Sequence, residues 1–246
     1  MELDRPILRS IETIVESEVG ASFEVKTFLK RIGRYPNATI ILDSSVFIRY
    51  EKNSRFMREE LFRLESKGRK IVVPYAVLRE LKGAEIPVAW HQTVDCQEIH
   101  KHRAEAIEHL KKSRKMQVYN LLMPIVKKFM EGKPYEVTTA QLQLLEDKKH
   151  LLEQVLRSDF SVLLQENGAT KAYALLTESF KISEADTAVV AVAISACRRT
   201  GNPVIIGARD WDIQDAVHDL RRDYPLLHYV KATGPKPSGS RTGTQK

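Results

Sequence analysis

The chain alternates short apolar segments rich in β-branched residues with longer segments of helical periodicity, and this alternation constrains its fold more than any other feature. The apolar segments are the four runs 38–42, 70–73, 204–206 and 226–230. Short, almost continuous apolar runs are typical of strands that are buried on both faces of a parallel sheet. Because helical patterns separate these runs, the sequence predicts an α/β fold in which layers of helices enclose a central parallel sheet.

Helical periodicity connects the predicted strands. It covers the segments 44–67, 75–81, 184–199 and 211–220, with an interruption expected near Asn53 in the first of them. Before the first strand, apolar residues recur at helical intervals from residue 7 to residue 32. We therefore expect an N-terminal helical extension over residues 1–36.

A long stretch without a recognisable strand interrupts the alternation between residues 88 and 180. Its amphipathic segments are rich in Lys, Glu, His and Gln, and they predict a helical insertion. A helix that begins at Thr138 or Thr139 is expected to pack with its neighbours as a helical hairpin. The α/β domain would then cover residues 37–232, followed by a disordered basic tail at 233–246, which has no apolar anchor.

The composition is that of an ordinary soluble globular protein, with 43% hydrophobic and 29% charged residues. The net charge is +7, but four positive charges lie in residues 231–246, so the charge permits a nucleic-acid partner without requiring one. Cys96 and Cys197 follow no disulfide pattern, which favours a reducing compartment and a cytoplasmic location. The N-terminus lacks the features of a signal peptide, and the apolar run 187–197 is too short to cross a membrane.

Acidic residues gather where the predicted strands end. Asp43 follows the first strand, Glu80 lies on the helix after the second, and Asp186 begins the helix before the third. Asp210 and Asp212 follow the third strand. Carboxylates crowded at one edge of a sheet repel one another, and a hard divalent cation such as Mg²⁺ or Mn²⁺ relieves that repulsion. A site of this kind is suited to phosphodiester hydrolysis.

Each acid also has a simple structural interpretation. Asp43 or Ser44 can cap the following helix, Ser183 and Asp186 fit a capping box, and Asp210 fits a turn. Their joint placement at one sheet edge favours a functional site over these separate roles.

The order and context of these acids resemble the PIN-domain family of metal-dependent nucleases. The family's first-strand motif is matched by the run from Asp43 to Phe47, and its P-x-x-V-x-x-E-L segment is matched by the run from Pro74 to Leu81. Asp186 stands at the head of an alanine-rich helix, and the run from Asp210 to Ile213 matches the D-x-D motif after a strand. The resemblance covers roughly residues 37–231, apart from the insertion.

The resemblance implies a PIN-like three-layer sandwich and a hydrolase that binds Mg²⁺ or Mn²⁺. It implies an endoribonuclease in which a metal-activated water cleaves RNA and leaves 5′-phosphate and 3′-hydroxyl ends. The implied catalytic and metal-binding quartet is Asp43, Glu80, Asp186 and Asp210, with Asp212 as a further metal ligand.

Other residues near the expected site have supporting roles in this interpretation. By the resemblance, Ser45 would orient the first carboxylate or a metal-bound water. Arg49, Arg79 and Arg209 are candidates for contacts with substrate phosphates. Trp90 and Trp211 are interpreted as packing residues, although Trp211 lies close enough to the site to be a candidate for base stacking.

The sequence departs from the family pattern at two places. Many members carry Ser or Thr two residues before the fourth acid, where this chain has Ala208. The insertion is longer than in the toxin-type nucleases and is similar in kind to the protruding helical pair of the minimal prokaryotic protein-only RNase P family. The N-terminal helices match neither group.

Alternatives to the ribonuclease stay open at this point. One is an inactive PIN-like scaffold that binds RNA or a protein partner, and another is a structure-specific DNA nuclease. The sequence also leaves open an inhibitory protein partner and a homo-oligomer formed through the extension or the insertion.

Overall fold

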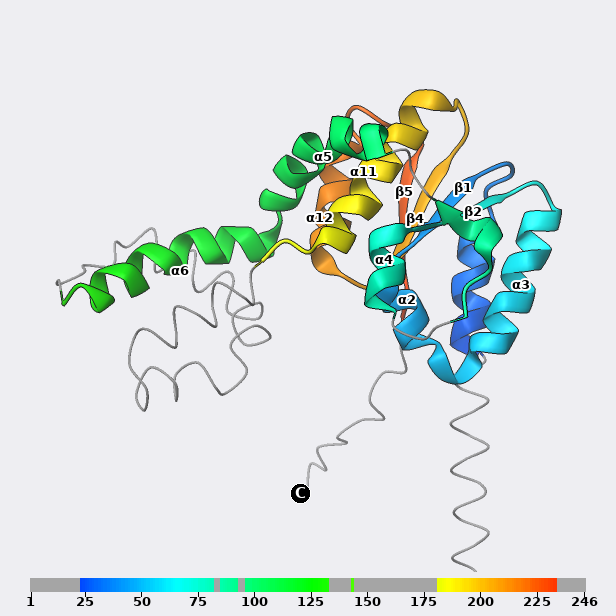
Figure 1. The fold of residues 1–246 in the computed structure, drawn as a ribbon, viewed down its shortest axis with the longest axis horizontal. Coiled ribbons are helices and arrows are strands. Elements are labelled where there is room, and N and C mark those ends of the chain that lie inside the picture. The colour runs from blue at the N-terminus through cyan, green and yellow to red at the C-terminus, as the bar shows by residue number, and fades with distance from the viewer. Residues whose placement is uncertain (1–22, 82–84, 93–95, 133–142, 144–180, 234–246) are drawn as a thin grey trace, which may run out of the picture.

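The structure of the 246-residue chain is a computed structural model that describes residues 23–81, 85–92, 96–132, 143 and 181–233 (Figure 1). Three sequence-based predictions concern residues outside these ranges: the helical pattern before residue 23, the hairpin that follows Thr138 or Thr139, and the tail after residue 233.

A parallel sheet forms the centre of the fold, as the sequence predicts. Its strands are β1 (Thr39–Leu42), β2 (Lys70–Pro74), β3 (His91–Gln92), β4 (Val204–Ala208) and β5 (Leu227–Lys231). They lie in the order β3-β2-β1-β4-β5, and every neighbouring pair is parallel. The strands β2, β1, β4 and β5 therefore make a four-stranded parallel sheet, which the two-residue β3 extends.

Strand β3 corrects the prediction that residues 88–180 contain no strand. Its residues His91 and Gln92 pair with Val73 and Pro74 at the end of β2. The strand is only two residues long and contains no apolar run, so a search for strand periodicity could not detect it.

The helices agree closely with the predicted periodicity. They are α2 (Ser44–Arg49), η1 (Glu51–Asn53), α3 (Ser54–Ser66), α4 (Tyr75–Glu80), η2 (Val88–Trp90), α5 (Cys96–Lys111), α6 (Arg114–Met130), α11 (Glu184–Arg199) and α12 (Trp211–Leu220). The interruption expected near Asn53 is the short 3₁₀ helix η1.

Helices cover both faces of the sheet, in agreement with the complete burial of β1 and β4. The helices α4, α5, α11 and α12 lie on one side, and α3 and the helical segment 23–32 lie on the other (Figure 1). A Cβ added to Gly207 of β4 would lie 2.9 Å from the ring of Phe28, so the absence of a side chain lets this helix pack closely on the sheet. The architecture is compatible with a three-layer α/β sandwich.

Two segments outside the predicted βα units contribute to the central core. Val25, Phe28 and Ile32 from the helical segment 23–32 are fully or almost fully buried there. Ala106 and Leu110 of α5 are buried in the same core, against α11. The following helix α6 begins beside α12 and runs away from the sandwich (Figure 1).

None of the helices in the described part of the chain is both long and apolar enough to span a lipid bilayer.

Candidate metal centre

Asp43 lies directly after β1 and caps helix α2. Its Oδ2 atom accepts a 3.0 Å hydrogen bond from the backbone N–H of Ser45, and the Ser45 hydroxyl donates to the same oxygen. The residue is 1% exposed, and its other carboxylate oxygen, Oδ1, is buried without a hydrogen-bond partner among the described residues. A buried carboxylate oxygen that lacks a donor is costly, so this atom is available for a cation.

Asp186 is held in place by the N-terminus of α11. The Ser183 hydroxyl accepts a 2.8 Å hydrogen bond from the Asp186 backbone N–H, and this bond caps the helix as the sequence suggests. Every residue from Thr187 to Ala196 is buried, and this part of α11 anchors the helix against the sheet. Because the backbone makes the cap, the Asp186 carboxylate is left to face the other acids.

Asp210 lies in the connection between β4 and α12. It occupies the N-cap position of α12, but its side chain makes no capping hydrogen bond. Instead the backbone of the connection is fixed by Tyr229 of β5, whose hydroxyl donates to the carbonyl oxygens of Ala208 at 3.0 Å and of Asp210 at 3.2 Å. The Asp210 carboxylate is therefore not used to cap α12.

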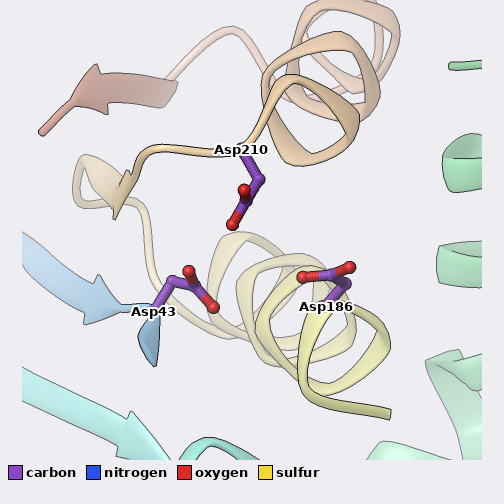
Figure 2. Close-up of side chains that lie close together, drawn as sticks. All are labelled: Asp43, Asp186 and Asp210. Atoms are coloured by element: carbon purple, nitrogen blue, oxygen red, sulfur yellow. The ribbon is translucent and has the colours of Figure 1, made fainter. Parts of the chain in front are cut away.

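These three aspartates meet at the carboxyl edge of the sheet (Figure 2). Asp43, Asp186 and Asp210 each offer a carboxylate oxygen, and these oxygens all lie within 4.8 Å of one another. The strand register brings Asp43 and Asp210 together, because Leu42 pairs with Gly207 and the two segments leave the sheet side by side. The carboxylates come from the connection between β1 and α2, from the connection between β4 and α12, and from the start of α11.

Burial and the proximity of the other carboxylates raise the pKa of Asp186 and Asp210. Burial, together with the charges of Asp43, Asp210 and Asp212, raises the pKa of Asp186 to about 7. Burial of the carboxyl group, with Asp43 as the next contribution, raises the pKa of Asp210 to about 6, although the residue as a whole is exposed. Both shifts mean that negative charge is disfavoured at this site unless a cation neutralises it.

The donor set fits a hard divalent cation. All three groups offer carboxylate oxygens, and Asp43 Oδ1 has no competing donor among the described residues. Oxygen-only sites of this kind are typical of Mg²⁺, Mn²⁺ and Ca²⁺ rather than of softer metals.

Glu80, the fourth acid expected from the resemblance, lies outside this group of three. It is the last residue of α4, is exposed, and accepts a 2.8 Å hydrogen bond from the hydroxyl of Ser44, the neighbour of Asp43. It also lines a cavity of about 510 Å³ whose wall includes Phe47 and Ile48. Glu80 is thus connected to the centre through α2, and its direct role as a ligand stays a prediction.

Asp212 also lies outside the group of three. Its Oδ2 atom is 3.4 Å from the ammonium group of Lys115 at the start of α6, and its Oδ1 atom is buried without a hydrogen-bond partner in the described structure. Its negative charge contributes to the raised pKa values of Asp186 and Asp210. The structure supports an electrostatic role for Asp212 and leaves its coordination of a metal as a prediction.

The three arginines expected to contact substrate have different surroundings. Arg49 lies 3.7 Å from the carboxylate of Glu24, and Arg79 lies 2.8 Å from the carboxylate of Glu184. Arg209 is exposed beside Asp210. Of the three, only Arg209 directly adjoins one of the clustered aspartates in the sequence.

Sequence reasoning missed the contribution of Tyr229. A tyrosine in the last strand is normally interpreted as a packing residue, whereas this hydroxyl holds the connection that carries Asp210. The available signal was its place on β5, the strand adjacent to the one that leads into Asp210, because neighbouring strands share the functional edge.

The structure also shows the hydrogen bonds around Ala208, the position at which many PIN domains carry Ser or Thr. Ala208 is buried, and its backbone carbonyl accepts hydrogen bonds from the Tyr229 hydroxyl and from the backbone N–H of Ala232. The neighbouring backbone N–H of Arg209 donates a 2.9 Å hydrogen bond to the hydroxyl of Ser45. Ser45 therefore connects the first and fourth acidic segments without a hydroxyl at position 208.

Comparisons with models of known families, with curated proteins and with solved structures found no match to this chain. The relation to PIN domains therefore stays a prediction from the sequence motifs.

Proposed function

We propose that this protein is a divalent-metal-dependent endoribonuclease of the PIN type. The observation that carries the proposal is the meeting of Asp43, Asp186 and Asp210 from three distant parts of the chain, with their carboxylate oxygens within 4.8 Å. Their common edge of a parallel sheet is where α/β proteins place their functional groups. The sequence motifs that resemble PIN nucleases contain the same three residues.

In this proposal, Asp43, Asp186 and Asp210 hold Mg²⁺ or Mn²⁺ at the sheet edge. When bound, the metal would polarise the phosphodiester and lower the pKa of an attacking water. Ser45 keeps the Asp43 carboxylate oriented through its hydroxyl and its backbone N–H. Asp212 adds negative charge to the centre, and Glu80 supports the start of α2 through Ser44.

The experiment that tests this function is cleavage of a labelled mixed RNA pool in Mg²⁺, Mn²⁺ or EDTA. The wild-type protein is compared with Asp43→Asn, Asp186→Asn and a control, Asp223→Asn, which alters an exposed aspartate in the turn after α12. We expect cleavage by the wild type and the control that requires metal and is lost in the two site variants. Matched single-stranded and flap-shaped DNA substrates test the alternative of a DNA nuclease.

Three results would reject the proposal. Cleavage that persists in EDTA, or that Asp43→Asn and Asp186→Asn retain, would show that the activity does not depend on this centre. RNA binding without cleavage under every metal condition would favour the inactive scaffold.

A further inference from the structure

Trp211 is an exposed aromatic side chain directly beside the acidic centre. It follows Asp210 in the sequence and is the first residue of α12. The residue is 42% exposed, whereas the second tryptophan of the chain, Trp90, is 1% exposed and donates its indole N–H to Glu65. Trp90 is a packing residue, and Trp211 presents a large part of its apolar surface to solvent.

A lysine accompanies the exposed indole. The ammonium nitrogen of Lys231 lies 4.0 Å from the centre of the Trp211 ring, which is the geometry of a cation–π interaction. Lys231 is the last residue of β5 and pairs with Ala208 at the end of β4. The lysine and the indole are therefore held at the same sheet edge as Asp43 and Asp210.

The charges along this edge change sign between neighbouring strands. The ends of β1 and β4 lead into Asp43 and Asp210, whereas β5 ends at Lys231, and the exposed Arg209 adjoins Asp210. An acidic centre alone repels a polyanion, so a nucleic acid at this site needs cations beside it. An aromatic face next to a cation also provides what an unpaired nucleotide requires, because the base stacks and the phosphate binds the positive charge.

We propose that Trp211 and Lys231 form a binding shelf for an unpaired nucleotide of single-stranded RNA, adjacent to the cleaved phosphate. The base stacks on the exposed part of the Trp211 indole, and a neighbouring phosphate contacts the Lys231 ammonium. This inference rests on the proposed function and deepens it, because it specifies that the substrate is unpaired at the position beside the metal centre.

Tryptophan fluorescence gives a direct test, because the chain contains only two tryptophans. The Trp90→Phe protein reports on Trp211 alone, and the added Asp43→Asn substitution prevents turnover during the titration. The probe is a single-stranded oligoadenylate of about ten nucleotides, a length within the range that single-strand-binding proteins cover. We expect saturable quenching of the Trp211 emission by the single strand, and no quenching by the same strand in a duplex.

Binding of a labelled form of the oligoadenylate, measured by fluorescence anisotropy, separates the two side chains. Trp211→Ala should weaken binding about tenfold, the scale expected for loss of one stacked base, and Trp211→Phe should restore part of it. Lys231→Gln should weaken binding and lower the slope of log affinity against log salt by about one. The control Lys70→Gln removes an exposed lysine from the opposite edge of the sheet. It should leave the affinity and its salt dependence unchanged.

The results distinguish failure of the shelf from failure of the proposed function. Wild-type affinity in both Trp211→Ala and Lys231→Gln, or absence of quenching in a protein that cleaves RNA, would overturn the shelf and leave the nuclease intact. Quenching and binding that depend on both residues in a protein without nuclease activity would support the shelf and reject the enzyme. Unchanged melting temperature and Mn²⁺ binding in Trp211→Ala would show that its effect is on RNA and not on the position of Asp210.

Discussion

The hydroxyl of Ser45 accepts a 2.9 Å hydrogen bond from the backbone N–H of Arg209, a residue 164 positions later in the chain. The same hydroxyl donates to the carboxylate of Asp43. One side chain therefore connects the acid that follows β1 to the segment that carries Asp210. This contact links the segments that carry two of the three clustered carboxylates.

Ser45→Ala should lower RNA cleavage by about 10–100-fold, because groups that orient metal ligands have effects of this size. The free energy of unfolding should fall by about 1–2 kcal/mol, since the Arg209 N–H loses its partner. Steady-state cleavage and urea denaturation measure the two effects. Ser66→Ala is the matched control, because the Ser66 hydroxyl donates to a carbonyl oxygen in the same exposed helix end. An equal effect of the two substitutions on cleavage and stability would contradict the role of Ser45.

Glu80→Gln should reduce cleavage less than Asp43→Asn. Glu80 contacts Ser44 and lies outside the group of three, so we expect a loss of about 10–100-fold. Asp43→Asn should cost about 10³-fold or more, because it removes a charged ligand from the centre. The comparison uses single-turnover cleavage rates at saturating Mg²⁺.

Glu85→Gln provides the control for Glu80, because both residues line the same cavity and Glu85 pairs with Arg58 away from the aspartates. If Glu80→Gln is as inactive as Asp43→Asn, Glu80 acts directly in the metal centre, as the family resemblance implies, and the secondary role argued from this structure is wrong.

The stability of the metal-free protein should decrease as the pH rises from about 4 to about 7. The folded-state pKa of Asp186 is about 7, above its ordinary value of 3.8, so in this window the folded protein binds more protons than the unfolded chain. Asp210, with a pKa of about 6, contributes in the same direction. Thermal melting in EDTA at a series of pH values measures how the melting temperature changes with pH. Asp186→Asn should make this change smaller.

Mg²⁺ should reverse this pH dependence, because the cation binds the deprotonated carboxylates. At pH 8 we expect Mg²⁺ at about 100 times its Kd to raise the melting temperature by roughly 5 °C. At pH 5 the increase should be much smaller, since protons compete with the metal. An equal increase at both pH values, or in Asp186→Asn, would mean that Mg²⁺ binds elsewhere.

Tyr229→Phe should lower cleavage by about tenfold while the protein stays folded. The hydroxyl fixes the carbonyls of Ala208 and Asp210, so its removal loosens the segment that presents the Asp210 carboxylate. Tyr224→Phe is a control with the same chemical change, because the Tyr224 hydroxyl contacts Arg198 and Glu105 instead. Equal cleavage by wild type and Tyr229→Phe would show that this hydrogen bond does not position Asp210.

The sequence predicted the parts of the fold that local patterns determine. The strand before Asp43, the Ser183 cap before Asp186 and the strand before Asp210 are each recognisable within a few residues, and the parallel arrangement follows from the repeated βα pattern. Because parallel strands share one functional edge, the meeting of the three aspartates could also be expected.

The remaining features depend on tertiary contacts that no local pattern contains. Nothing in the sequence near β3 indicates that His91 and Gln92 pair with the end of β2. The position of Glu80 depends on how the six-residue helix α4 packs beside α2, and its hydrogen bond to Ser44 follows from that packing. Packing also decides that α5 covers α11 as part of the sandwich.

The central claim is that three distant aspartates form one metal centre, and direct measurement of Mn²⁺ binding by isothermal titration calorimetry at pH 8 tests it most directly. The account predicts saturable binding to the wild type and to Asp223→Asn, and loss or severe weakening in Asp43→Asn, Asp186→Asn and Asp210→Asn alike. Binding of wild-type strength in any of the three site variants would contradict it.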